Sequence, residues 1–309
     1  MSTGQLNMPQ PMGEERIGGL GARIVAAASY PAIMVLGFVL YGVAAGFGVS
    51  VTLASYGAVL VCAALITVHE IVLPYRQEWK PARGELGTDA VFMVLVQIAL
   101  PLLLAITAVV VIADYLDASG FYVHDIWPHD WPVIVQVIVM LLVADFFRYW
   151  LHRAFHRFVP MWRFHAVHHS PKRLYWLNVG RFHPIEKAIQ YAVDALPFAL
   201  LGVSPEVLAA YFVFFAINGI FQHSNCRVNL GPLNYIVAGP ELHRWHHSVR
   251  QKESDNNFGN NLIVWDLLFG TRFLPREREV GPLGLTNRNY PTGFVAQMTT
   301  PFQRDLENG

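Results

Sequence analysis

Long apolar runs alternate with polar segments along the first half of this chain. Four of the runs are as long as a helix that crosses the hydrocarbon core of a bilayer, which needs about 20 residues. They cover residues 24–48, 51–73, 89–113 and 131–150. The first contains no charged residue, and the second carries only His69 and Glu70 near its end. The pattern therefore predicts four transmembrane helices.

Two shorter apolar stretches, 188–203 and 206–222, are joined by the turn GVSPE. They could be two short spans, but Pro197 inside the first would interrupt a straight helix, because proline lacks a backbone N–H. We therefore expect a short hairpin that dips into the membrane. From His223 onward the chain is polar and mixed, which predicts a water-facing cap.

The composition agrees with a membrane protein. Hydrophobic residues make up 54% of the chain and charged residues only 14%, whereas soluble domains carry about 25% charged residues. The formal net charge is zero, so the chain lacks the overall positive charge typical of nucleic-acid-binding proteins. Its two cysteines, Cys62 and Cys226, are too few for an iron–sulfur or four-cysteine zinc site, and their positions do not suggest a disulfide framework.

Basic residues in the loops predict the orientation. The segment 74–88 holds Arg76, Lys80 and Arg83, the segment 114–130 holds no lysine or arginine, and 148–187 holds eight. Cytoplasmic loops are enriched in such residues. Alternating spans therefore place the N-terminus, the 74–88 loop and the histidine-rich segments on the cytoplasmic side.

Tryptophans also mark the expected membrane boundaries. Trp79, Trp127, Trp131 and Trp150 flank the apolar runs. Tryptophan is enriched at the interface between bilayer and water, so we expect these side chains to lie at that interface.

Eight of the thirteen histidines lie in two clusters. The first reads HRAFHRFVPMWRFHAVHH and runs from His152 to His169, and the second reads HRWHH and runs from His243 to His247. Residues three and four apart on a helix share a face, so we expect each HxxHH group, and the HxxxH pair, to point its imidazoles at one place. The predicted ligands and catalytic residues are His152, His156, His165, His168, His169, His243, His246 and His247. Because eight imidazoles exceed the coordination of one ion, two metals are predicted.

Between the clusters, His183 and His223 are further candidate ligands. His69, His124 and His129 fit ordinary interfacial or core histidines better. Four acids could accept a hydrogen bond from the second ring nitrogen of a ligand histidine and so fix its tautomer. They are Asp145, Glu186, Glu241 and Asp266, and each could equally be an ordinary salt-bridged or solvated acid.

Neutral imidazole binds iron, zinc, copper and nickel, so the clusters alone leave several functions open. A collar that binds phospholipid headgroups would explain the basic residues but not the repeated HxxHH. A non-catalytic membrane metal transporter or sensor should carry ionisable residues inside its spans, and the first three runs have almost none. A zinc-dependent membrane hydrolase lacks an obvious base, because the position that HExxH fills with glutamate holds Arg153 or Arg244.

The motifs also resemble a known family. HRAFH, HAVHH and HRWHH, in this order and after paired apolar spans, resemble the three histidine boxes of the fatty acid hydroxylase/sterol desaturase superfamily. The segments NVGRFHPIE, QHSNCRVNLGPLNYIVAGPELHRWHH and NNFGNNLIVWDLLFGTRF extend the resemblance over residues 145–273. Within the superfamily, this half is most similar to the alkylglycerol monooxygenase and bacterial sterol-desaturase-like branches.

The resemblance implies a fold and a domain division. The expected fold is an all-α integral membrane protein with four spans, a membrane-dipping hairpin and a cytoplasmic, histidine-rich, di-metal cap. The expected division is a flexible N-terminal tail at 1–23, a transmembrane region at 24–130, a catalytic domain at 131–273 and a C-terminal tail at 274–309.

The resemblance also implies an activity. It points to a non-haem di-iron oxygenase that uses O2 and two external electrons to hydroxylate or desaturate a sterol, an alkyl ether lipid or a fatty-acyl chain. Two irons are the expected cofactors, and zinc could replace them in purified protein. The N-terminal tail is too short for a fused cytochrome b5, so we expect a separate donor of the cytochrome b5 or ferredoxin type with its reductase.

Carried over to this sequence, the ligands are the eight clustered histidines and His223, with His183 less certain. Asn218 stands where some fatty acid hydroxylases carry another histidine, which leaves the coordination set open. The lipid path could be lined by aromatic residues near the boxes, namely Phe146, Phe147, Trp162, Phe164, Tyr175 and Trp176.

Overall fold

The computed structural model describes residues 19–107 and 126–303. Most of the predicted N-terminal tail, the end of the third apolar run, most of the 114–130 segment with His124, and residues 304–309 lie outside the described residues. Within the described ranges the regular structure is helical, and β-pairing is limited to isolated bridges. The all-α prediction is therefore confirmed.

The α-helices, with the labels used in the figures, follow one another along the chain. They are α1 (Leu20–Gly46), α2 (Val51–Val72), α3 (Arg83–Phe92), α4 (Leu100–Thr107), α6 (Val133–Arg157), α7 (Val159–His169), α8 (Pro184–Asp194), α9 (Leu196–Leu200), α10 (Pro205–His223), α11 (Pro240–His246), α12 (Gln251–Ser254), α13 (Val264–Phe269) and α14 (Phe294–Thr299). A π-helical stretch, Met93–Ala99, makes α3 and α4 one continuous helix. Short 3-10 turns lie at Gln77–Trp79, Trp176–Gly180, Gly231–Tyr235 and Thr300–Phe302.

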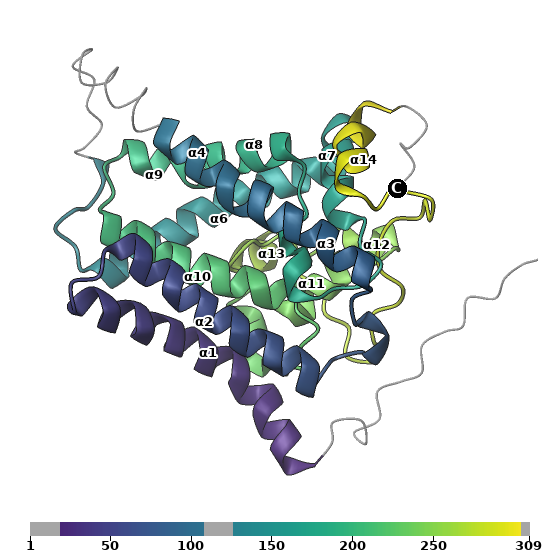
Figure 1. Cartoon of the computed structure of the whole chain (residues 1–309), viewed down its shortest axis with the longest axis horizontal. Helices are drawn as coiled ribbons and strands as arrows, with labels where there is room; N and C mark the ends of the chain where they lie inside the picture. Colours follow the sequence, from purple (N-terminus) through teal and green to yellow (C-terminus); the bar gives the residue numbers. More distant parts are fainter. Residues whose placement is uncertain (1–18, 108–125, 304–309) are drawn as a thin grey trace, which may run out of the picture.

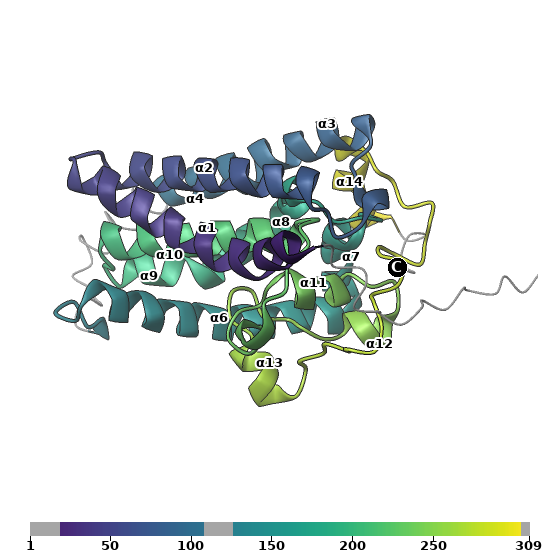
Figure 2. The same cartoon turned by 90° about the horizontal axis from the view of Figure 1, so that it is seen from below.

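The long helices lie side by side, and α7, α11, α12 and α14 gather towards one end of this bundle (Figures 1 and 2). Among the described residues, five helices are long and apolar enough to cross a membrane: Leu20–Gly46, Val51–Val72, Arg83–Thr107, Val133–Arg157 and Pro205–His223. They present many exposed apolar side chains to the outside. Such a surface fits lipid as the surrounding solvent.

The hairpin expected at 188–222 has two unlike limbs. The first is broken into α8 and α9 at Ala195, two residues before Pro197, as the proline predicts. The second, α10, is a continuous helix of 19 residues that begins with Ser204 as N-cap and Pro205 in its first turn. By length and composition α10 is a fifth candidate span, which the sequence pattern of four spans and a hairpin did not separate out.

Helix α10 occupies the centre of the bundle and packs against α1, α2 and α6. A Cβ on Gly37 of α1 would come within 2.3 Å of Ile217 Cδ1, so glycine allows α1 to approach α10 closely. Tyr30 of α1 donates a hydrogen bond from its hydroxyl to Asn218 Oδ1 at 2.7 Å. Asn218, at a position where a histidine was considered, therefore ties helices together.

Two of the four marker tryptophans are placed differently from the interfacial prediction. Trp131 and Trp150 are exposed, but Trp79 and Trp127 are buried. Trp79 packs with Leu174 and Trp245 under the cap, and Trp127 donates a hydrogen bond to Gln136 Oε1 at 2.6 Å. A tryptophan side chain suits the interface between bilayer and water, but tertiary packing buries both Trp79 and Trp127.

The segment after 273, divided off as a tail in the sequence, contains packed structure. Val280 and Leu283 are buried beside Trp79, and α14 packs against α3. Gln297 donates to Ser170 Oγ at 2.9 Å, next to the end of α7. The described part of this segment therefore covers the histidine-rich end of the bundle.

Candidate metal centre

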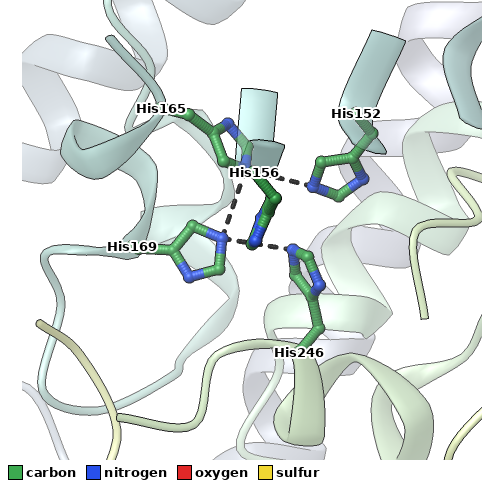
Figure 3. Close-up of side chains that lie close together, drawn as sticks. All are labelled: His152, His156, His165, His169 and His246. Carbon is green, nitrogen blue, oxygen red and sulfur yellow. Dashed lines mark hydrogen bonds between the residues drawn. The ribbon is translucent and has the colours of Figure 1, made fainter. Parts of the chain in front are cut away.

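Nine histidines converge in two buried groups at this end of the bundle. The five-histidine group contains His152, His156, His165, His169 and His246 (Figure 3). The four-histidine group contains His168, His223, His243 and His247. Within each group one ring nitrogen of every residue lies within 4.8 Å of the others. The two groups adjoin, since the rings of His169 and His247 stack with centroids 4.5 Å apart.

The two HxxHH motifs are split between the groups, contrary to the expectation that each motif aims at one place. The i, i+4 pair of α7, His165 and His169, joins the five-histidine group, while His168 joins the other. The second motif, on α11 and its C-cap residue His247, is divided the other way. Its i, i+4 pair His243 and His247 belongs to the four-histidine group, and His246 belongs to the five-histidine group. The helical repeat explains the split, because residues i+3 and i+4 point about 100° apart around the axis.

In the five-histidine group the Nε2 atoms face one another. His165 Nε2 lies 3.0 Å from His152 Nε2 and 3.2 Å from His169 Nε2. His169 Nε2 lies 3.1 Å from His246 Nε2 (Figure 3). His156 Nε2 is buried and has no hydrogen-bond partner among the described residues.

The four-histidine group repeats this arrangement. His168 Nε2 lies 3.3 Å from Nε2 of His223, and His223 is the last residue of α10. His243 Nε2 lies 3.0 Å from His247 Nε2. Three helices, α7, α10 and α11, therefore supply this group.

The opposite ring nitrogens contact acceptors that fix the tautomers. His152 Nδ1 lies 2.9 Å from the Phe258 carbonyl and His246 Nδ1 lies 2.8 Å from the Asn256 carbonyl. A carbonyl oxygen can only accept, so Nδ1 carries the hydrogen and Nε2 presents its lone pair to the group. His168 Nδ1 faces a third carbonyl, that of Arg181, at 3.3 Å.

Side-chain acceptors hold three further histidines. His165 Nδ1 lies 2.6 Å from Glu186 Oε1, and His156 Nδ1 lies 3.2 Å from Asp255 Oδ1. His223 Nδ1 lies 2.8 Å from Asn178 Oδ1, whose amide nitrogen donates to the Arg173 carbonyl. Of the four acids proposed from the sequence for this role, only Glu186 contacts a histidine directly.

Asp145 and Asp266 act on the loop that supplies the carbonyls. Asp145 accepts hydrogen bonds from the backbone N–H groups of Asn261 and Leu262, at 2.9 and 2.5 Å. Asp266 accepts from the Phe258 and Gly259 N–H groups, at 2.8 and 2.7 Å. Gly259 is required there, because an added Cβ would lie 2.3 Å from the Leu262 carbonyl oxygen. These two acids therefore position the loop rather than the imidazoles themselves.

The remaining candidates lie apart from both groups. Glu241 accepts from the Leu230 N–H and from Asn234, and so braces the turn before α11. His183 is the N-cap of α8: its Nδ1 accepts from the Ile185 N–H, and its Nε2 lies 3.3 Å from the Met298 carbonyl. The structure thus brings together nine of the ten histidines proposed as ligands.

Burial keeps the site histidines neutral. Desolvation lowers the pKa well below the ordinary value for the six site histidines that lie outside the candidate membrane-spanning helices, with further lowering from neighbouring imidazoles. These are His165, His168, His169, His243, His246 and His247. Burial also raises the pKa of Glu186 to about 8, although Arg148, Gln190 and Lys187 oppose the shift. Neutral imidazole is the form that binds metals.

The donor sets fit two metal ions. Several buried Nε2 lone pairs that face one another without a hydrogen between them repel, and a cation at the centre of each group relieves this repulsion. Nitrogens that share an ion at about 2.1 Å lie about 3.0–3.4 Å apart, and the five short Nε2 pairs lie 3.0–3.3 Å apart. The outer hydrogen bonds to carboxyl and carbonyl groups are those that orient ligand histidines.

A cavity of ≈ 700 Å³ leads from the membrane-spanning helices to both groups. Its inner end is lined by His152 and His165 of the five-histidine group and by His168, His223 and His243 of the other. Elsewhere its walls are largely apolar and come from α2, α4, α6, α8, α9 and α10. Of the six aromatic residues proposed from the sequence, Trp176 lines the cavity. Seven other aromatic residues that the sequence analysis did not propose also line the cavity. They are Tyr56, Phe155, Phe182, Tyr191, Tyr211, Phe212 and Phe215.

Fold and site together define a helical membrane protein in which two buried polyhistidine groups face an apolar cavity. The fatty acid hydroxylase family model matches residues 137–271. Over 292 residues the chain is 35% identical to the ornithine lipid hydroxylase OlsE of Rhizobium tropici, a match that covers 92% of this chain and 86% of that protein. The chain therefore belongs to the fatty acid hydroxylase superfamily.

Shorter matches cover only the histidine-rich half. The chain is 34% identical over 146 residues to alkylglycerol monooxygenase of Homo sapiens, which is 47% of this chain and 32% of that protein. It is 33% identical over 148 residues to the very-long-chain aldehyde decarbonylase GL1-8 of Oryza sativa subsp. japonica, 47% of this chain and 54% of the relative. No solved structure is significantly similar. These relatives support a lipid-modifying oxygenase.

Sequence reasoning missed several contacts of the site. Asn178 and Asp255 lie in segments that carry motif residues, so their polarity was a usable signal. The carbonyls of Asn256, Phe258 and Arg181 have no sequence signal, because every residue carries one. Two polar residues of α8, Gln190 and Asp194, were hidden inside the 188–203 stretch, which reads as mainly apolar.

Proposed function

We propose that this protein is a membrane-bound di-iron oxygenase that hydroxylates a lipid, with the nine histidines of the two groups as iron ligands. The observation that carries the proposal is the single cavity whose inner end is formed by histidines of both groups and whose walls are apolar helices. A volume of ≈ 700 Å³ suits part of a lipid molecule. The overall reaction takes up O2, two electrons and two protons, places one oxygen atom in the lipid and releases the other as water.

Iron supplies the oxidising chemistry, which side chains alone lack. The protein contributes binding, orientation and exclusion of water. The Nε2 atoms would hold the metals, and the outer acceptors would keep the Nε2 lone pairs directed at them. Glu186 shares a hydrogen with His165 Nδ1 across 2.6 Å and so can adjust the donor strength of that imidazole. The apolar wall orients the substrate and keeps bulk water from the reacting carbon.

Hydroxylation is favoured over desaturation by the relatives. The full-length relative is an ornithine lipid hydroxylase and the half-length ones include a monooxygenase. Because the ornithine lipid hydroxylase matches the membrane helices as well as the histidine-rich half, an acylated amino-acid lipid is the first candidate substrate. Alkyl ether lipids rank next, since alkylglycerol monooxygenase matches only the second half.

The proposed topology places both histidine groups on the cytoplasmic side. The loop with Arg76, Lys80 and Arg83 and the basic residues of α6 and α7 support this orientation. A cytoplasmic or membrane-bound electron donor of the cytochrome b5 or ferredoxin type could then reach the site without crossing the bilayer.

The testing experiment measures metal content and turnover on the same detergent-purified protein. About two irons per chain are expected, with 18O from 18O2 found in a hydroxylated ornithine lipid when a reductant is supplied. Two zincs and no oxidation, persisting after iron reconstitution, would instead indicate a zinc hydrolase. One metal ion or none would refute the two-site assignment.

A further inference from the structure

Helix α8 buries its polar face and exposes its apolar face. Its charged and polar residues Glu186, Lys187, Gln190 and Asp194 are buried, whereas Ile185 and Ile189 are exposed. A helix on the surface of a water-soluble protein shows the opposite arrangement. All four buried residues line the cavity that leads to the histidines.

Arg148 completes this polar face from the neighbouring helix α6, one turn before the ligand His152. Its Nη2 donates to Asn260 Oδ1 at 3.2 Å, and its Nε lies 3.6 Å from Asp194 Oδ2, too far for a hydrogen bond. Nε and Nη1 have no hydrogen-bond partner among the described residues. Only 7% of Arg148 is exposed, so these donors are hidden from water.

Lys187 is the second buried cation. Its ammonium makes no hydrogen bond or ion pair with the described residues and instead lies 5.4 and 5.6 Å from the ring centroids of Phe182 and Phe215. The two carboxyl groups of α8 form no ion pair with it, although Glu186 Oε2 is buried and has no hydrogen-bond partner among the described residues. Glu186 Oε1 contacts both His165 and Gln190, and Asp194 is paired with Arg148.

Leaving such donors unpaired is costly. A buried ammonium or guanidinium without a partner is strongly destabilising, because nothing replaces the hydration that the charge loses on burial. Arg148 and Lys187 line the cavity together with the carboxyl groups of Glu186 and Asp194. Neither cation forms a hydrogen bond with these carboxyl groups, and Arg148 Nε and Nη1 have no hydrogen-bond partner among the described residues. An anionic ligand would satisfy them.

We propose that Arg148 and Lys187 form a subsite that binds an anionic group, a carboxylate or a phosphate, of the lipid substrate inside the cavity. Arginine offers two N–H groups to such an oxyanion, and lysine adds a point charge. The term substrate rests on the proposed function, but the binding site itself does not. Neutral sterols and alkyl glycerols lack the group that this subsite selects.

The test measures lipid binding to the full chain in detergent, without turnover. The probes share one acyl chain: an N-acylated ornithine lipid with a free carboxylate, its methyl ester, a phosphatidylglycerol and a diacylglycerol. The wild-type protein should bind the free acid at least tenfold more tightly than the methyl ester. Lys187→Met should reduce this ratio to near one, and Lys187→Arg should retain it.

Lys80→Met is the matched control, because Lys80 is exposed in the 74–88 loop, and it should keep the wild-type ratio. Metal content should stay unchanged in all three variants, which separates loss of the subsite from collapse of the site. Should Lys187→Met fail to fold, Arg148→Gln gives the same readout.

Tighter binding of phosphatidylglycerol than of the ornithine lipid would keep the subsite and identify phosphate as its anion. Equal affinity for acid and ester in the wild type, or an undiminished ratio in Lys187→Met, would overturn the proposal. Binding preference without any lipid oxidation by iron-loaded protein would leave the subsite standing and refute the proposed function.

Discussion

The two histidine groups differ in the partners that hold them. In the five-histidine group two imidazoles contact carboxyl groups, Glu186 and Asp255. In the four-histidine group the known partners are neutral, the Asn178 side chain and the Arg181 carbonyl. A carboxyl group makes a hydrogen bond roughly twice as strong as a neutral acceptor does whenever it is ionised, and neither the Asn178 amide nor the Arg181 carbonyl can ionise. We therefore expect the five-histidine group to hold its metal more tightly.

The groups also differ in their access to the cavity. Three of the four histidines of the smaller group line it, but only two of the five in the larger group. A metal site that performs chemistry keeps an open position, whereas a site that mainly holds a metal is closed by protein ligands. The four-histidine group is therefore the more open of the two towards the cavity, and under the proposed function we expect it to be the group nearer to O2 and substrate.

The largest effect should come from single ligands that test the crossed arrangement of the motifs. His246→Ala should remove the metal of the five-histidine group, although His246 lies on α11 with His243 and His247. Iron should fall from about two to about one per chain, and turnover should fall more than about 100-fold, beyond the loss typical of an outer partner. Elemental analysis and 18O incorporation measure both.

His168→Ala is the converse variant and should empty the four-histidine group instead. Spectroscopy of the single remaining iron should then differ between the two variants. Identical spectra of the remaining iron would show that the motifs do not exchange ligands as the structure indicates.

A smaller effect is expected from the outer partners. Glu186→Gln replaces the carboxyl group beside His165 with an amide and should weaken metal retention about 10- to 100-fold, the range for such partners. Asn178→Ala, its counterpart at His223, should weaken retention less. Metal loss to a chelator over time ranks them, and a larger loss in Asn178→Ala would reverse the comparison of the two groups.

The next effect in order of size should be a loss of stability at low pH. The folded protein keeps its site histidines neutral, because burial lowers their pKa values, while unfolded histidines take up protons below about pH 6.5. Stability of the metal-free protein is therefore complete above that pH and falls as the pH drops below it, by up to about 1.4 kcal/mol per unit for each buried histidine. Melting temperatures at pH 5.5 and 7.5 measure the loss, and His247→Gln should make it shallower. Equal melting temperatures at both pH values would contradict the neutral, buried state.

The smallest effect is expected at His183. Asparagine can replace its capping of α8, so His183→Asn should change metal content and turnover by less than about threefold. Loss of one iron per chain would instead make His183 a ligand.

The sequence by itself determined the helical membrane fold, the break before Pro197 and the identity of the nine histidines that converge. Apolar runs, proline and repeated histidine spacings are local features, and their consequences follow from helix geometry and the bilayer. The family resemblance rested on the same motifs, and the comparisons confirm it.

Tertiary structure alone decided how those histidines are shared. A one-dimensional spacing gives the direction of a side chain around its own helix, but the arrangement of α7, α10 and α11 in space decides which of the two groups each imidazole joins. The carbonyl partner of His152, from Phe258, depends on the conformation of a loop whose backbone N–H groups are bound by Asp145 and Asp266. The sequence alone does not give that conformation. The same holds for Lys187, because a basic residue at the start of an apolar stretch acquires a role only when the neighbouring helix buries it beside Arg148.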